Sequence, residues 1–373
     1  MNIYADLIPA LHGGVPAWWT WIVYIAILAV GVFFLVKFSD MFVDGTSSIA
    51  KRMHISPLII GLTIVAFGTS CPELAVSTSD SITCLLNGGH ANVAVGNVIG
   101  SNICNLLMVL GISAAFTPIA VKKSVCKKEF PILLGISALC TLFVLLFVKD
   151  FAGVDISGGD PKTLGITRWE GIVFVLLIIA YIVYIVVDAK RQIKLGLVDA
   201  NDGGEEVSNE VLPVWKCIVF TIVGLIGVVV GGEAVVYSAQ NIALDIGTVA
   251  GLDTNVVGLV VGLTVVAVGT SLPELVTSAV AAKRGENEIA LGNVIGSNLF
   301  NILFVMGIAS TVNPLTVGAD IWLDLVFMGI ATVLVFVFAL TGKIKKWNGW
   351  VLVGIYIIYV GVLMLRTFGV ITL

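Results

Sequence analysis

The segment GLTIVAFGTSCPEL, residues 61–74, decides the architecture because the chain contains it twice. The segment GLTVVAVGTSLPEL at residues 262–275 lies 201 positions later, and 11 of the 14 positions are identical. A second pair of segments follows the first pair. GNVIGSNICN at 96–105 and GNVIGSNLFN at 292–301 agree at 8 of 10 positions. The chain is therefore an internal duplication, and the repeated segments are where a function shared by both halves is expected.

The composition is that of a polytopic helical membrane protein. Of the 373 residues, 58% are hydrophobic and only 12% are charged, and the mean hydropathy is +1.08. Those values exclude an ordinary soluble globular domain. The three histidines and six cysteines show no metal-binding or CxxC spacing, so the cysteines are expected to be packing thiols. Neither a phosphate-binding GxxxxGK[ST] loop nor HExxH is present, and we expect no enzyme activity and no cofactor.

Apolar runs long enough to cross a bilayer predict the helices. The tryptophans fall near the ends of these runs, where amphipathic rings lie at the headgroups. The sequence predicts an all-α polytopic protein with ten transmembrane helices, near 18–44, 57–82, 92–115, 130–148, 170–187, 214–240, 256–281, 288–311, 321–341 and 348–366.

Charge in the loops predicts the orientation of these helices. Fifteen Lys and Arg residues fall in one set of alternate loops, and four fall in the other set together with the termini. Because Lys and Arg accumulate in cytoplasmic loops, both termini are expected outside. Each half holds five helices, and since five is odd, the second half must enter the membrane inverted relative to the first.

The predicted organisation has three parts. The first five-helix repeat is 1–188 with its motif at 61–111, a short acidic cytoplasmic loop is 189–213, and the second repeat is 214–373 with its motif at 262–307. Within the loop, residues 199–210 nearly fit a calcium-binding EF-hand loop. Its mismatches at positions 5 and 8 favour a solvated acidic linker instead.

Proline predicts a break in the duplicated helices. Pro72 and Pro273 cannot donate to the carbonyls of Gly68 and Gly269, four residues earlier. A helix break inside a membrane is stable only where it lines a cavity or is buried in protein. Free carbonyl oxygens at such a break are suitable ligands for hard cations.

Side chains at helical spacing surround each predicted break. Thr69 and Glu73 are four residues apart, as are Thr270 and Glu274, so each pair is expected to share a face. These oxygens, without sulfur or imidazole, favour calcium or alkali cations over zinc, copper or iron. The serines next to the threonines and two polar stripes complete the set: Ser70, Ser271, Asn97, Ser101, Asn105, Asn293, Ser297 and Asn301.

Tight helix packing is the alternative explanation for the small and amide residues of the motifs. It accounts well for the glycines, notably Gly61, Gly96, Gly100, Gly292 and Gly296. For several asparagines, packing and ion binding are equally good explanations. Packing does not account for the two glutamates. Each acidic group costs about 2.5–3.5 kcal/mol at the centre of a bilayer, and the chain keeps two at equivalent positions.

Other ionisable groups in the apolar segments leave alternatives open. Asp40 and Glu233 occupy corresponding positions in the first and sixth helices. They are expected either beside an ion path or extended toward the cytoplasmic side, where Lys37 is a candidate partner for Asp40. Three further aspartates are expected toward the outer face: Asp80, Asp253 and Asp320.

The paired GTSxPE and GNxIGSNxxN segments resemble the alpha repeats of sodium/calcium exchangers, over essentially the whole chain. The resemblance implies that the second, third, seventh and eighth helices form the ion-binding core. The first and sixth helices would slide across this core. Glu73, Glu274, Thr69 and Thr270 would bind calcium. Sodium sites would add Ser70, Ser101, Ser271, Ser297 and the carbonyls of Ala66 and Ala267, with Asn105 and Asn301 completing the central position.

The function implied is electrogenic antiport of sodium against calcium, by alternating access, across the plasma (cell inner) membrane. The expected partners are these ions and the lipid bilayer, with no nucleic acid and no obligate protein partner. Potassium-dependent relatives carry aspartate where this chain has Asn301, so potassium is not expected to take part. The GTSxPE pattern favours sodium over protons as the counter-ion. Proton/calcium exchange on the same scaffold is the alternative, and a cation channel is a third possibility.

Overall fold

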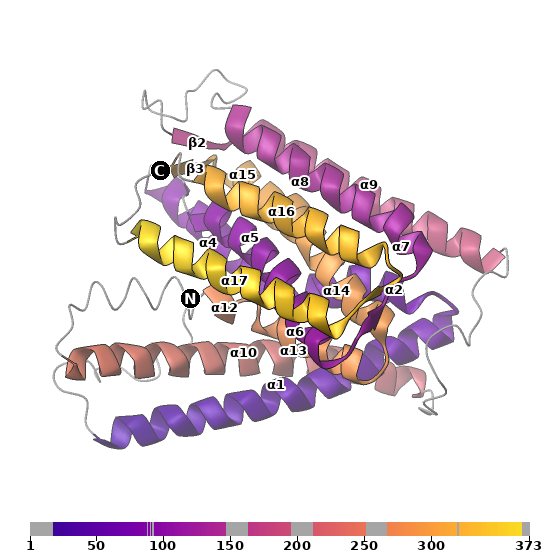
Figure 1. The fold of residues 1–373 in the computed structure, drawn as a ribbon, viewed down its shortest axis with the longest axis horizontal. Coiled ribbons are helices and arrows are strands. Elements are labelled where there is room, and N and C mark those ends of the chain that lie inside the picture. The colour runs from indigo at the N-terminus through magenta and orange to yellow at the C-terminus, as the bar shows by residue number, and fades with distance from the viewer. Residues whose placement is uncertain are drawn as a thin grey trace.

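The computed structural model describes residues 18–87, 89, 91, 93–146, 163–194, 212–250, 267–318 and 321–367. These parts are almost entirely helical (Figure 1). Eight helices in them are long and apolar enough to cross a membrane, or nine if the bent pair Pro57–Thr69 and Cys71–Leu86 is one span. The predicted class, an all-α polytopic membrane protein, is confirmed.

The helices of the first half lie where apolar runs predict them, except for the short α7 (Lys123–Lys127), which lies between two predicted runs. They are α1 (Trp18–Met53), α2 (Pro57–Ile60), α3 (Ala66–Thr69), α4 (Cys71–Leu86), α5 (Val93–Cys104), α6 (Leu110–Phe116), α7 (Lys123–Lys127), α8 (Glu129–Leu146) and α9 (Arg168–Lys194). Two π-helical segments interrupt the α-helices, η1 (Gly61–Val65) and η2 (Asn105–Val109). Hydropathy does not predict such segments.

The described helices of the second half follow α9 along the chain. It contains α10 (Val214–Val249), α12 (Ala267–Gly269), α13 (Leu272–Lys283), α14 (Asn287–Phe300), π-helical η4 (Asn301–Met306), α15 (Gly307–Val312), α16 (Trp322–Ala339) and α17 (Lys346–Thr367). The apolar run expected at 256–281 lies within the described residues only from 267 onward.

Two short antiparallel ribbons join the loops between helices, and the sequence did not predict them. β1 (Ile119–Ala120) pairs with β4 (Lys343–Ile344), and β2 (Thr163–Ile166) pairs with β3 (Leu315–Gly318). Each ribbon therefore joins a loop of the first half to a loop of the second half. The two halves are interlocked at their ends as well as along their helices.

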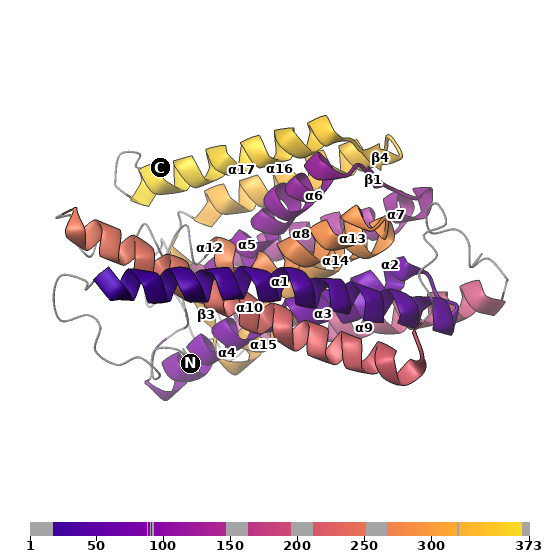
Figure 2. The ribbon, with the colours of Figure 1, turned by 90° about the horizontal axis from the view of Figure 1, so that it is seen from below.

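Helices α5 and α14, which contain the two copies of the GNVIGSN segment, lie at the centre of the molecule (Figures 1 and 2). In the apolar windows of Val93–Phe116 and Asn287–Val312, 83% and 94% of residues are buried, against 22% in the window of α1. Such a helix is enclosed by protein, whereas α1 presents most of its surface outward. The repeated motifs thus occupy the interior.

Helices α1 and α10 form a closely packed pair along one side of the molecule (Figure 1). A Cβ added at Gly45 would lie 2.7 Å from the backbone nitrogen of Thr221. One added at Gly224 would lie 2.7 Å from the backbone nitrogen of Phe42. Because glycine removes the side chain at both contacts, the two backbones approach more closely than larger residues allow.

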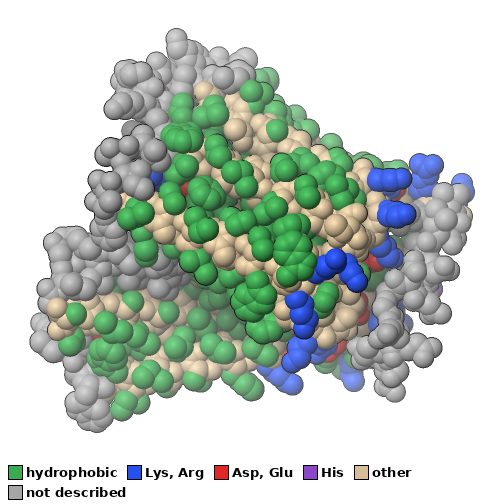
Figure 3. Space-filling model, in the orientation of Figure 1, with side chains coloured by type: hydrophobic (Ala, Val, Ile, Leu, Met, Phe, Trp, Pro, Cys, Tyr) green, Lys and Arg blue, Asp and Glu red, His purple; other side chains and the backbone are tan. Residues whose placement is uncertain are grey.

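Apolar side chains cover much of the face in Figure 3, and Lys and Arg side chains gather at one end of it. This is the end at which α2 and α7 lie in Figure 1. An apolar band with cations at one end is the surface that a bilayer requires.

Glycine also permits the central contact between the two repeats. A Cβ at Gly292 would lie 2.7 Å from the carbonyl oxygen of Leu58 and 3.0 Å from the Cα of Gly61. A Cβ at Gly296 would likewise lie 2.6 Å from the Cβ of Ala66. The packing expectation holds at these glycines, whereas the described residues show no contact within 4 Å at Gly96 or Gly100.

We predict that Gly292→Ala destabilises the protein by about 1–3 kcal/mol, because the new methyl group meets backbone atoms that cannot rotate away. Unfolding midpoints in detergent measure the effect. Gly329→Ala in α16 is the control, since a Cβ there meets nothing within 4 Å among the described residues. It should stay within about 1 kcal/mol of the parent. Equal midpoints for the two variants would contradict the packing argument.

Candidate cation-binding site

The helix breaks occur where proline predicts them. Helices α3 and α4 are bent by 46°, and Ser70 between them has φ −81° and ψ 4°. In the second repeat Ser271 precedes α13 with φ −90° and ψ 5°. Pro72 and Pro273 lie in the first turn after each break, where a missing N–H removes no helical hydrogen bond.

The breaks place two carboxylates in the protein interior. Glu73 and Glu274 are both 0% exposed. Neither carboxylate oxygen of Glu73, nor Oε2 of Glu274, has a hydrogen-bond partner among the described residues. The two groups are close enough to interact electrostatically. Buried acidic oxygens without donors are costly, and a bound cation would relieve that cost.

Hydroxyl groups approach each glutamate from the opposite repeat. Ser70 Oγ donates to Glu274 Oε1 at 3.3 Å. Thr69 also lies beside Glu274, and Thr270 lies beside Glu73. The pairing of Thr69 with Glu73 assumed a continuous helix. Because the helix is broken between them, each threonine instead approaches the glutamate of the other repeat.

Serines of the central helices complete the surroundings of the carboxylates. Ser101 of α5 lies beside Glu73, and Ser297 of α14 lies beside Glu274. Ser297 Oγ is also 3.4 Å from Thr69 Oγ1. The buried hydroxyls of Thr270 and Ser271 have no hydrogen-bond partner within the described ranges. Most of the predicted hydroxyl ligands are therefore brought together around the two glutamates.

Asn105 and Asn301 begin the π-helical segments η2 and η4. Both are 0% exposed, and their side-chain nitrogen and oxygen atoms lack partners in the described part of the chain. A π-helical turn is uncommon and often marks a functional site. Equivalent residues of the two repeats thus share the same unusual backbone and the same unpaired amide.

The two predicted carbonyl ligands belong to Ala66 and Ala267, in the helices before the two breaks. The carbonyl of Ala66 accepts the N–H of Ser70 at 3.0 Å and lies 3.4 Å from Thr69 Oγ1. A carbonyl oxygen has two lone pairs, and the hydroxyl of Thr69 donates to the one that the helical bond leaves. Ala267 begins α12, immediately before the second break.

Asn293 belongs to the site region although the sequence placed it only in the surrounding stripe. Its Oδ1 accepts from Thr69 Oγ1 at 3.1 Å, and its Nδ2 donates to Ser278 Oγ at 2.9 Å. The equivalent Asn97 donates to Ser77 Oγ at 3.0 Å. The signal that could have found these contacts is the repeat itself, because Ser77 and Ser278 are also equivalent.

The structure places the two ionisable residues considered outside the glutamate pair, Asp40 and Glu233. Asp40 pairs with Arg284 Nη2 at 2.7 Å, so the proposed partnership with Lys37 is wrong. The reason is that Arg284, far away in sequence, packs against α1. Glu233 lines a small cavity beside Thr270.

The acidic residues expected at the outer face are described only in part. The carboxylate of Asp80 accepts the N–H of Val93 at 3.2 Å, at the start of α5. Asp253, Asp320 and the EF-hand-like loop at 199–210 lie outside the described residues.

Broken helices that bring buried carboxylates together inside a polytopic bundle are typical of ion-transporting membrane proteins. The family model for the sodium/calcium exchanger protein matches residues 23–187 and 216–365. The chain therefore belongs to the sodium/calcium exchanger family.

Individual proteins support this assignment along nearly the whole chain. Sodium/calcium exchanger MaX1 of Methanosarcina acetivorans is 32% identical over 355 residues, which cover 90% of this chain and 97% of MaX1. Inner membrane protein YrbG of Escherichia coli is 32% identical over 298 residues, covering 78% and 80%. A structure of the sodium-calcium exchanger NCX_Mj is similar with a TM-score of 0.71 and 32% identity, covering 91% of this chain and 98% of that one. The protein is a multi-pass membrane antiporter of the cation/calcium class.

We predict that Asn293→Ala destabilises the protein more than Asn97→Ala. Asn293 makes contacts to Thr69, Ser278 and Ser297, whereas the side chain of Asn97 donates to Ser77. Unpairing buried polar groups costs about 1–3 kcal/mol, so the difference should be of that order. Unfolding midpoints of the two variants, in the same detergent without calcium, decide the matter. The prediction fails if Asn97→Ala is the less stable of the two.

Proposed function

We propose that this protein exchanges sodium for calcium by alternating access at one mid-membrane site. The observation that carries the proposal is the pair of fully buried carboxylates of Glu73 and Glu274, which have few hydrogen-bond partners among the described residues. The complete ligand set would be Glu73, Glu274, Thr69, Thr270, Ser70, Ser271, Ser101, Ser297, Asn105 and Asn301, with the carbonyls of Ala66 and Ala267. All of these ligands can offer oxygen, as calcium and sodium require.

Charge balance gives the exchange its basis. Two ionised carboxylates supply a charge of −2, which one calcium ion or two sodium ions neutralise. Binding calcium and two sodium ions together would leave two uncompensated positive charges away from water. The ions therefore compete for the site. A further sodium ion held by neutral hydroxyl or amide oxygens would make the exchange electrogenic, as the family resemblance implies.

The proposed architecture is two inverted five-helix repeats, 1–188 and 214–373, with ten spans and the acidic loop 189–213 between them. Equivalent contacts support it, because Asn97 bonds Ser77 as Asn293 bonds Ser278. The π-helical segments also begin at equivalent asparagines.

Location and orientation follow from the charged end of the molecule. Since Lys and Arg gather at one end (Figure 3), we place that end in the cytoplasm and both termini outside. The similarity to a protein named an inner membrane protein supports the plasma (cell inner) membrane as the location. The bilayer and the transported ions would be the partners, without a cofactor.

Sodium-driven calcium flux tests the exchange directly. Proteoliposomes loaded with sodium and diluted into sodium-free medium should take up calcium at clamped pH. Uptake should continue when choline replaces potassium, because Asn301 adds no charge to the site. Uptake driven by a pH gradient alone would establish proton/calcium exchange instead. Uptake with neither gradient would establish a channel.

The two glutamates should be indispensable. Glu73→Gln and Glu274→Gln each remove half of the site's charge and should lower calcium transport by about two orders of magnitude or more. Glu129→Gln is the matched control. Glu129, at the start of α8, is also buried, but it accepts a hydrogen bond from Tyr181 at 2.9 Å. That variant should keep its exchange activity. Active exchange by either of the first two variants would refute the proposed site.

A further inference from the structure

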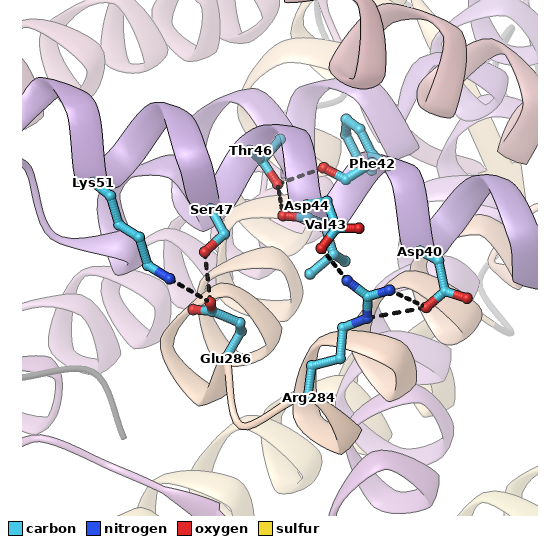
Figure 4. A network of polar contacts seen from close by, with 9 residues as sticks. All are labelled: Asp40, Phe42, Val43, Asp44, Thr46, Ser47, Lys51, Arg284 and Glu286. Carbon is cyan, nitrogen blue, oxygen red and sulfur yellow. Dashed lines mark hydrogen bonds and ion pairs between the residues drawn. The ribbon is translucent and has the colours of Figure 1, made fainter. Parts of the chain in front are cut away.

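A row of polar side chains on α1 is bound to the turn between α13 and α14 (Figure 4). Arg284, at the end of α13, pairs with Asp40 Oδ1 at 2.7 Å through Nη2 and with Asp44 through Nη1. The two aspartates are four residues apart, so one guanidinium bridges successive turns of α1. A planar guanidinium with several N–H groups is suited to that double contact.

The same turn binds α1 again further along. Glu286 Oε1 accepts the hydroxyl of Ser47 at 2.5 Å and pairs with Lys51 Nζ at 3.7 Å (Figure 4). Together with Asp40 and Asp44, these residues form one stripe on α1. We call this set of contacts the α1 clamp: Asp40, Asp44, Ser47 and Lys51 on α1, with Arg284 and Glu286 on the turn.

The α1 clamp connects two parts with different roles. On one side is α1, which packs closely against α10 through glycine contacts. On the other side is the turn between α13, which carries Glu274, and α14, which carries Ser297. Gly285 in this turn has φ +80°, a conformation that favours glycine and reverses the chain within three residues. The clamp therefore ties the α1–α10 pair to the helices of the proposed site.

Among the described residues, no side chain forms an ion pair with Glu233, the acidic residue of the repeat-equivalent stripe on α10. Positions 193 residues after Asp40, Asp44 and Ser47 are Glu233, Tyr237 and Gln240. These three side chains line a cavity of about 130 Å³, together with Pro72 and Thr270 beside the helix breaks. The stripe on α1 is therefore bonded to a turn, whereas the equivalent residues of α10 line a cavity next to the site.

The sequence explains why the clamp is one-sided. Positions 201 residues before Arg284 and Glu286, at the matching end of α4, are Thr83 and Leu85. Neither side chain can form an ion pair, so the first repeat cannot hold α10 as the second repeat holds α1. The duplicated motifs are alike at the site but differ in charge at this turn.

We propose that Arg284 and Glu286 are positioning residues that close the site at the Lys/Arg-rich end by holding α1, while the cavity along α10 gives access from the other side. This inference rests on the proposed function, in which the site opens alternately to the two sides. Sliding of the α1–α10 pair across the core would separate Arg284 from both aspartates. The charged side chains of the clamp are between 15% and 35% exposed, so water and salt screen the pairs and the clamp can open.

Sided transport measures the population of the two states. The apparent affinity at each face is proportional to the fraction of molecules whose site opens to that face. Arg284→Gln removes the charge at similar size and should lower the calcium KM at the Lys/Arg-rich face by about three- to tenfold, while raising it at the other face. Right-side-out and inside-out membrane vesicles give the two values. Arg284→Lys should restore most of the parent ratio.

The controls separate the α1 clamp from general effects of charge. Arg366→Gln breaks a comparable pair, with Asp324 at 3.1 Å between α17 and α16, and should leave the KM ratio unchanged. Asp44→Asn combined with Arg284→Gln should add little to Arg284→Gln alone, because both remove the same contact. If Arg284→Gln does not fold, Glu286→Gln is measured in its place. An unchanged ratio, or equal changes at both faces, would overturn the proposal.

A second measurement does not depend on ion transport. Gln240→Cys places a thiol in the cavity along α10, and a membrane-impermeant maleimide should label it from outside. Mass spectrometry of the peptide containing position 240 distinguishes this thiol from the native cysteines. Adding Arg284→Gln should slow the labelling about three- to tenfold. If sodium and calcium exchange fails but labelling responds, only the proposed function is refuted. Unchanged labelling overturns the clamp.

Discussion

Two buried carboxylates, of whose four oxygens only Oε1 of Glu274 has a hydrogen-bond donor among the described residues, are the constraint on which the rest depends. Each acidic group costs about 2.5–3.5 kcal/mol at the bilayer centre, and Glu73 and Glu274 are wholly buried. Three features lower this cost: the prolines that break the helices, the hydroxyls beside the carboxylates and the enclosed central helices. A site built in this way is most stable when a cation of matching charge occupies it.

The neighbours of each carboxylate come from both halves of the chain. Ser70 donates to Glu274, and Thr69 contacts Asn293 and Ser297 on α14. Surroundings shared in this way cannot form in one half alone, so the two halves must pack together. The glycine contacts between the halves allow the necessary close approach.

The α1–α10 pair is connected to this core by a different kind of interaction. Within the pair, glycines bring the two backbones together, whereas Arg284 and Glu286 reach α1 through partly exposed charged groups. Close apolar packing resists separation, while partly solvated ion pairs exchange readily with water. The molecule thus combines a closely packed pair of helices with partly solvated ion pairs between α1 and the turn before α14.

The sequence by itself determined the class of protein, the approximate positions of the long apolar helices, the helix breaks and the identity of the buried glutamates. These features follow from local causes: hydropathy over a span, the missing N–H of proline and an internal repeat. Only the tertiary structure decided that Thr69 faces Glu274 rather than Glu73, that Asn293 joins the site and that Asp40 pairs with Arg284. Spacing rules assume a continuous helix and near neighbours, whereas these contacts form across a break or between helices more than 200 residues apart.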